Sequence, residues 1–205
     1  MRYAIIPLVF VSALLVSCSN ESNPVGASAP SGVSTELLEA YVYMSGGAQT
    51  VLTTSSSRIA VRFWPYVSRD MQDGVLARFG ASRKMEFSIF SLVIAATDDA
   101  FALAPRLSMD PRVQYVGPVF ETACGLEVPG NEFIVRGDIS GDDVPQLLAA
   151  AGARIVSTRP DDPKRFLMSV PWGDARDLYE LVDRLDRSPG IVYAQPNHAY
   201  QVCLR

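Results

Sequence analysis

The chain repeats one pattern of segments, and this repeat limits the folds open to it more than any other feature of the sequence. The segment VQYVGPVFETAC (113–124) resembles IVYAQPNHAYQVC (191–203), and each ends in a cysteine. Further upstream, RIAVRF (58–63) matches EFIVR (132–136). Because the matching segments occur in the same order, we expect two structural units of one kind.

In the second half of the chain, strand and helix signals alternate. Four short runs rich in β-branched and aromatic residues predict strands: 132–136, 153–157, 165–170 and 190–193. Apolar residues recur at the helical period over 142–151 and again after Asp174, which is a candidate helix cap. The resulting order, β-α-β-β-α-β, predicts an antiparallel sheet with both helices on one face.

The first half follows the same order. Its strands are expected at 58–63, 91–95 and 110–115 and its helices at 71–79 and 99–107. Pro105 should kink or shorten the second of these helices. Ahead of this unit, two β-rich runs flank Ser45-Gly46-Gly47 and predict a hairpin, with Tyr41 and Tyr43 packing from one face.

The predicted fold class is α+β, with two tandem ferredoxin-like (βαββαβ) units. Each antiparallel sheet should carry its helices on one face and leave the other face free to meet a partner or its twin unit. The hairpin plus the first unit spans 38–122, and the second unit spans 131–205.

The first residues indicate export. Residues 1–17 place Arg2 before an apolar run, the pattern of a secretory signal peptide. The sequence LVSC (15–18) resembles the lipobox of bacterial lipoproteins, which implies that Cys18 is diacylated; the alternative is an ordinary cleaved signal. Ser19 replaces the Asp that retains lipoproteins at the inner membrane, which favours the outer membrane. Residues 18–37 indicate a flexible tether.

Charge and cysteine usage exclude some functions. The formal net charge is −4, or −5 without residues 1–17, and no basic run supports nucleic-acid binding. In an exported protein, Cys124 and Cys203 occupy equivalent places after the repeated strands and are predicted to form a structural disulfide. Such a bridge would close a loop of about 80 residues and stabilise the fold by roughly 4 kcal/mol. His198 is the only histidine, so we expect no metal site, and nothing indicates a cofactor.

The order of the motifs resembles the prodomains of subtilisin-like serine proteases, and the fervidolysin-like type is most similar. The resemblance rests on RIAVRF, YVGPVF, NEFIVR and YAQPN, which follow one another within about residues 38–200. In that family the prodomain is a folding template and a tight temporary inhibitor. Its sheet packs on two surface helices of the protease, and the tail after the last strand lies in the active-site cleft.

Carried over to this chain, the resemblance implies a protease-binding tail with Leu204 and Arg205 nearest the specificity pockets. The candidate tail residues are His198, Ala199, Tyr200, Gln201, Val202, Leu204 and Arg205. The chain departs from the family because it has no Asp-Thr-Gly, His-Gly-Thr or Gly-Thr-Ser constellation. It departs again at Cys203, because a disulfide there would hinder the tail from entering a cleft.

We therefore expect a non-catalytic, lipid-anchored module that binds, inhibits or assists the folding of a subtilisin-like protease. One alternative is an envelope interaction or structural lipoprotein that kept the prodomain fold without protease contact. Another is a fragment of a longer subtilase. Arg136-Gly137-Asp138 matches an adhesion tripeptide, and Asp138 with Ser140 suggests a calcium loop, but helix capping is the favoured interpretation of this segment.

Overall fold

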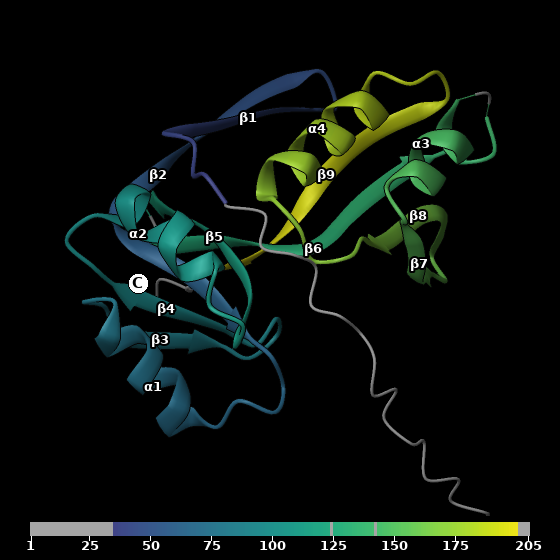
Figure 1. The fold of residues 1–205 in the computed structure, drawn as a ribbon. Coiled ribbons are helices and arrows are strands. Elements are labelled where there is room, and N and C mark those ends of the chain that lie inside the picture. Colours follow the sequence, from purple (N-terminus) through teal and green to yellow (C-terminus); the bar gives the residue numbers. More distant parts are fainter. Residues whose placement is uncertain (1–34, 124, 142, 201–205) are drawn as a thin grey trace, which may run out of the picture.

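The computed structural model describes residues 35–123, 125–141 and 143–200, which contain nine strands and four helices (Figure 1). The strands are β1 (Ala40–Ser45), β2 (Ala48–Phe63), β3 (Ser82–Phe87), β4 (Leu92–Ala96), β5 (Val113–Thr122), β6 (Gly125–Gly137), β7 (Arg154–Arg159), β8 (Asp162–Ser169) and β9 (Ile191–Tyr200). The helices are α1 (Arg69–Arg78), α2 (Ala100–Ser108), α3 (Val144–Ala150) and α4 (Ala175–Asp186). We call β1 to β5 with α1 and α2 the first half, and the remaining elements the second half.

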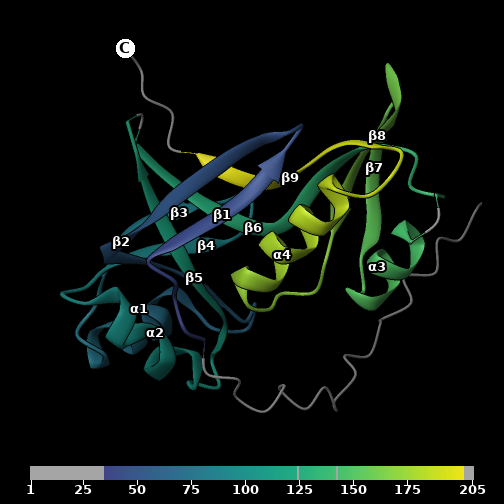
Figure 2. The same cartoon turned by 90° about the horizontal axis from the view of Figure 1, so that it is seen from above.

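All nine strands belong to one curled antiparallel sheet (Figures 1 and 2). The strand order is β3-β4-β2-β5-β6-β8-β7, with β1 paired to β2 and β9 paired to β6. The predicted fold class, two tandem ferredoxin-like units with a sheet each, is therefore wrong. The two halves join because β5 and β6 form a hairpin in which Phe120 lies opposite Glu127 and Thr122 opposite Gly125.

The curl of the sheet comes from two long, irregular strands. β2 has 16 residues and β6 has 13, against about 5 to 6 in an average strand. The register of β2 on β5 shifts between Thr54 and Ile59, and that of β6 on β9 shifts between Pro129 and Phe133. Such irregularities bend a strand and increase its twist, so each long strand can serve two differently oriented parts of the sheet.

Each half buries one face of its strands against its own helices. The first-half core includes Ile59, Val61, Val75, Leu76, Val93, Leu103 and Leu107. The second-half core includes Phe133, Val135, Met168, Leu178, Val182 and Leu185. In both cores alternate strand residues point toward the helices, as the two-residue period of a strand requires.

The opposite face of the first half is also covered, contrary to the prediction of a free face. A third core lies there, formed by Ala60, Leu92, Ile94, Tyr115 and Val119 together with Phe87 and Phe90. Val128 and Ala199 of the second half complete it, and Trp172 packs against it. The curl of the sheet thus brings the second half over the surface that an isolated first unit would leave open.

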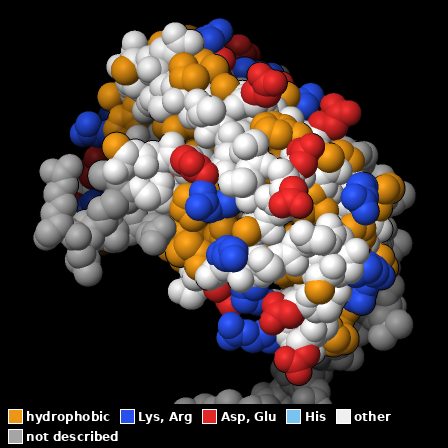
Figure 3. All heavy atoms as spheres, turned by 90° about the vertical axis from the view of Figure 1, so that its left-hand side faces the viewer, with side chains coloured by type: hydrophobic (Ala, Val, Ile, Leu, Met, Phe, Trp, Pro, Cys, Tyr) orange, Lys and Arg blue, Asp and Glu red, His pale blue; other side chains and the backbone are white. Residues whose placement is uncertain are grey.

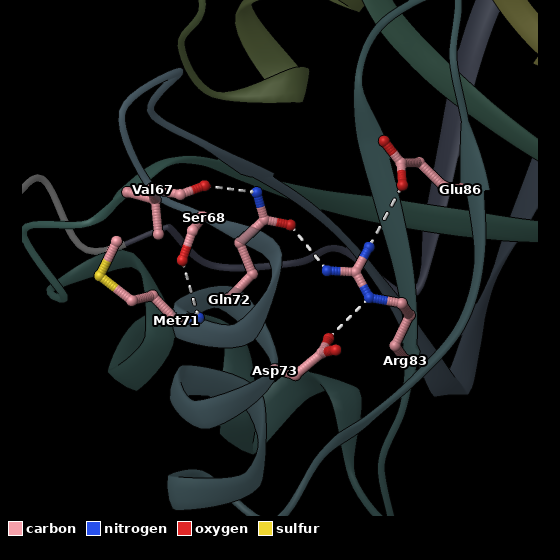
Figure 4. A network of polar contacts seen from close by, with 7 residues as sticks. All are labelled: Val67, Ser68, Met71, Gln72, Asp73, Arg83 and Glu86. Atoms are coloured by element: carbon pink, nitrogen blue, oxygen red, sulfur yellow. Dashed lines mark hydrogen bonds and ion pairs between the residues drawn. The ribbon is translucent and has the colours of Figure 1, made fainter.

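Arg83 ties the edge strand β3 to helix α1 (Figure 4). Its guanidinium donates to the side-chain oxygens of Asp73 (2.6 Å) and Gln72 (2.7 Å), and it forms a longer ion pair with Glu86 (3.3 Å). The Ser68 hydroxyl caps the first turn of the same helix. The strand at this end of the sheet is therefore held by side chains as well as by its pairing with β4.

A buried carboxylate joins three segments of the first half. Asp110, in the turn between α2 and β5, forms ion pairs with Arg78 at the end of α1 and with Arg112. Nε and Nη2 of Arg112 donate to the two carboxylate oxygens at 2.9 and 2.8 Å. Hydrogen bonds from Arg112 lower the pKa of Asp110 and outweigh the opposing effect of burial.

We expect Asp110→Asn to lower the free energy of unfolding at pH 7 by about 2 kcal/mol, because charge-assisted hydrogen bonds are lost. A lowered pKa means that Asp110 stabilises the fold above its unfolded-state pKa and loses this effect as the pH falls through its folded-state pKa. Urea unfolding of both proteins should therefore show a difference that vanishes in acid. Asp73→Asn, at a more exposed ion pair, is the control and should cost under about 1 kcal/mol; equal losses at pH 7 would contradict this account.

Candidate functional site

The last strand contains three residues that the resemblance assigned to a free tail. β9 runs to Tyr200, beyond the strand predicted over 190–193. Its end pairs with β6, so that Tyr200 lies opposite Glu127. His198 and Ala199 are buried, whereas Tyr200 is exposed. These three residues are thus part of the sheet, and the segment that could enter a cleft begins after Tyr200.

The other residues of the sequence-predicted sites lie outside the described part of the chain. They are the lipid-attachment residue Cys18, the predicted disulfide pair Cys124 and Cys203, and the tail residues Gln201, Val202, Leu204 and Arg205. The lipid anchor, the bridge and the outer tail therefore stay predictions.

A buried chain of polar side chains holds the end of β9. Nδ1 of the His198 ring is hydrogen-bonded to the Glu127 carboxylate of β6, and its Nε2 lies 2.8 Å from the Tyr179 hydroxyl of α4. The exposed fractions of Tyr179, His198 and Glu127 are 3, 5 and 8%. Sheet, helix and C-terminal strand are thereby joined at one point.

The protonation of this chain follows from its donors and acceptors. An ionised carboxylate only accepts hydrogen bonds, so we assign the Nδ1 proton of His198 as the donor to Glu127. Burial raises the pKa of Tyr179 well above its ordinary value, so its hydroxyl stays protonated and donates to Nε2.

Aromatic rings from both halves surround this chain. The rings of Tyr41 and Tyr43 lie 5.0 and 5.6 Å from that of Tyr179, which confirms their predicted packing role. Phe120 of β5 lies 6.1 Å from His198. We call the set Tyr41, Tyr43, Phe120, Glu127, Tyr179 and His198 the junction cluster. It joins the N-terminal hairpin to α4, and both views in Figures 1 and 2 show β1 beside that helix.

The junction cluster has the parts of an acid–base relay but the setting of a structural anchor. A carboxylate orients an imidazole, and the imidazole contacts a hydroxyl, which is the order used to activate a nucleophile. The hydroxyl here is a buried phenol whose pKa is raised, so no phenolate forms near neutral pH. The junction cluster therefore holds β9 in place as far as its last residue, Tyr200.

The tripeptide at 136–138 is bound into the fold. Gly137 ends β6, and the Asp138 carboxylate accepts hydrogen bonds from the backbone N–H (2.9 Å) and hydroxyl (2.6 Å) of Ser140. Asp138 therefore stabilises the turn before α3. The predicted helix capping is wrong, because the N-cap residue of α3 is Asp143 and its side chain makes no capping hydrogen bond. Within the described ranges, no group of three or more potential metal ligands lies close together.

The second half leaves one sheet face without helices. On it Ile134 of β6 lies opposite Leu167 of β8, and Arg136 opposite Arg165. We call these four residues, with Gln195 of β9 opposite Ile134, the open face. Ile134 and Leu167 are half-buried and belong to none of the cores. Their neighbours are basic, and Arg136 is paired with Asp162 at 2.9 Å.

Charges of both signs are interspersed on the side of the molecule seen in Figure 3. Acidic and basic side chains alternate there with hydrophobic ones, and the described residues show no continuous basic stripe on this side. A surface of this kind gives no support to nucleic-acid binding.

Comparisons with known proteins found nothing similar: neither a family model, nor a curated protein, nor a solved structure matches the chain. Among the residues that the structure describes, none of the helices has the length and apolar character needed to span a membrane.

Proposed function

We propose that this chain is a non-catalytic module of the bacterial cell envelope, anchored by lipid at Cys18, that binds a subtilisin-like serine protease and inhibits it or assists its folding. The observation that carries the proposal is the anchoring of β9 as far as Tyr200. The resemblance to subtilase prodomains supplies the class of partner.

The fixed end of β9 suits a product-like inhibitor. Tyr200 is paired with β6, and two residues earlier His198 is held by Glu127 and Tyr179. A segment that starts from a rigid point loses less conformational entropy when it binds, so residues 201–205 can bind a cleft at lower cost.

In subtilase prodomains the sheet packs on two surface helices of the protease. The open face is the surface of this chain that corresponds to that part of the prodomain sheet. The curl of the sheet covers the corresponding face of the first half, so only the second half offers it. Ile134 and Leu167 at its centre are apolar, and Arg136 and Arg165 beside them are basic. This pattern, an apolar centre with charged neighbours, is common in protein interfaces.

The proposal is tested by inhibition of a panel of subtilisin-like proteases with residues 19–205, in oxidised and reduced form. Two altered proteins separate the tail from the open face: a version that ends at Gln201, and Leu167→Asp. We expect inhibition that weakens by about tenfold or more in each, since interface energy is concentrated in a few residues. Comparison of the two redox states shows whether the predicted bridge restricts the tail.

Ile155→Asp is the matched control for the open face. Ile155 is also an exposed apolar residue of the second half, but it lies on β7 opposite Met168 and thus on the other side of the sheet. It should leave inhibition unchanged. If folded, undegraded protein neither inhibits nor forms a complex with any protease of the panel in either redox state, the protease proposal fails for those enzymes and the envelope interaction alternative is favoured.

A further inference from the structure

A hollow of about 530 Å³ lies on the surface of the first half, where the ends of α1 and α2 meet the turn before β5. Three arginines line it: Arg78 at the end of α1, Arg106 in the last turn of α2, and Arg112 in the turn. Asp110 provides the one carboxylate among the described lining residues. The C-terminal end of each helix adds about half a negative charge, so about one positive charge is left in excess.

The three guanidinium groups are held in place by contacts within the protein. The buried carboxylate of Asp110 accepts from Nε and Nη2 of Arg112 and forms an ion pair with Nη2 of Arg78. The guanidinium groups of Arg78 and Arg106 lie 4.9 and 5.6 Å from the centre of the Phe79 ring. No carboxylate of the described residues forms an ion pair with Arg106. Guanidinium groups that are already oriented lose less freedom when an anion binds to their remaining N–H donors.

The second half builds the same two turns without most of these side chains. The N–H groups of residues 79–81 bond to carbonyls four, three and five residues earlier, and those of residues 151–153 do the same. The N–H groups of residues 110 and 113 each bond to a carbonyl three residues earlier, as do those of residues 188 and 191. By this correspondence Arg78, Phe79 and Arg112 are matched by Ala150, Ala151 and Gly190. The backbone therefore does not require an arginine or an aromatic ring at these three places, and the fold alone does not explain them.

Exposed apolar side chains adjoin the guanidinium groups. Met109 lines the hollow and is 62% exposed, and Pro111 beside it is also exposed. Tyr66 is 70% exposed, and its hydroxyl lies 3.5 Å from the carbonyl oxygen of Pro111. Arginine, methionine and aromatic residues are enriched in protein interfaces, whereas lysine and glutamate are depleted. The described lining residues include neither lysine nor glutamate, so the hollow has the composition of an interface.

We propose that this hollow binds an acidic segment of a partner polypeptide, with a carboxylate on the arginines and a neighbouring apolar side chain on Met109 and Pro111. An ionised carboxylate only accepts hydrogen bonds, and the planar guanidinium can donate two of them in parallel. One carboxylate also balances the excess positive charge. The hollow is formed by α1, α2 and the turn before β5, whereas the open face belongs to β6, β8 and β9. This contact is therefore separate from the proposed protease contact.

The test is a titration of residues 19–205 with the blocked dipeptide N-acetyl-Glu-Phe-amide, followed by calorimetry and by the NMR signal of the Met109 methyl group. N-acetyl-Gln-Phe-amide has the same shape without the charge. We expect the Glu peptide to bind at least about tenfold more tightly, because only a carboxylate accepts charge-assisted hydrogen bonds from arginine. Equal affinities for these two peptides overturn the proposal. N-acetyl-Glu-Gly-amide should bind several-fold more weakly than the Glu-Phe peptide, and equal binding would overturn the apolar part of the contact.

Two matched variants test the position of the contact. Arg106→Gln should weaken binding of the Glu-Phe peptide about tenfold. Arg184→Gln removes the same charge from the corresponding place in the last turn of α4, outside the hollow, and should change affinity less than twofold. Equal weakening by both would show that only the overall charge matters, which overturns the site. Arg106 is exposed, so its replacement should leave the thermal midpoint almost unchanged.

Sedimentation of the unaltered chain and of Arg106→Gln tests the other occupant of the hollow, a second copy of this chain. We expect the two proteins to have the same mass in solution. A dimer that Arg106→Gln dissociates would assign the hollow to self-association and overturn the separate partner.

Discussion

Replacing Glu127 with leucine should lower the free energy of unfolding at neutral pH by about 2–3 kcal/mol, the usual cost of leaving one partner of a charge-assisted hydrogen bond buried and unpaired. The change leaves Nδ1 of His198 without its acceptor where water cannot replace it. The Tyr179 contact on the other ring nitrogen cannot compensate, because it involves a different atom. Urea unfolding measures the loss, and amide hydrogen exchange should rise first along β9.

Glu132→Leu is the matched control. Glu132 is also a β6 carboxylate that contacts a β9 side chain, accepting from Nδ2 of Asn197 at 2.9 Å, but it is only half-buried. It should cost less than about 1 kcal/mol. The double variant Glu127→Leu with His198→Phe should recover only part of the loss, because it removes the unpaired Nδ1 but leaves the buried Tyr179 hydroxyl without its acceptor. Equal losses for the Glu127 and Glu132 variants would show that the junction cluster does not anchor β9.

The individual elements could be predicted because their signals are local. The helix predicted over 142–151 is α3 (Val144–Ala150), and Asp174 caps α4 as expected, accepting from the N–H of Arg176 at 2.8 Å. Pro105, expected to kink or shorten its helix, lies inside α2, a helix of nine residues. Periodicity and caps depend on residues three or four positions apart, so the sequence alone contains them.

The arrangement of the elements depends on contacts that leave no local signal. Alternation in β6 specifies which residues are buried, but it does not identify β5 as a partner. The last strand was expected over 190–193, but it continues through Pro196 to Tyr200. Among the described strands β9 pairs with β6 alone, so the missing N–H of Pro196 interrupts no ladder on the other edge.

The candidate site was equally beyond local signals. Glu127 and Tyr179 lie 71 and 19 residues from His198 along the chain, and no motif links them. The one hint in the sequence is the spacing of Ala194, Pro196 and His198, which keep the strand period past the proline and are all buried in the structure.

Replacing Gly137 with alanine should cost about 3–4 kcal/mol of the free energy of unfolding, through backbone strain and overpacking together. Gly137 has φ +143°, a conformation that other residues rarely adopt. A Cβ there would lie 2.7 Å from Cα of Ile191 and closer still to the carbonyl oxygen of Gly190. That carbonyl accepts from the Asp138 N–H (3.0 Å), so it cannot turn away without losing the hydrogen bond that joins β6 to the start of β9.

Gly47→Ala separates the two contributions. Gly47 also has a positive φ, +80°, but a Cβ there would meet nothing within 4 Å, so only the strain of about 1 kcal/mol applies. Chemical denaturation of both variants should therefore show a loss at Gly137 that exceeds the loss at Gly47 by about 2 kcal/mol. Equal losses would mean that the β6–β9 junction moves to admit a methyl group. A larger loss at Gly137 would show that the close packing of β6 against the start of β9 requires glycine at this position. Strand packing, and not adhesion, would then explain the glycine of the 136–138 tripeptide.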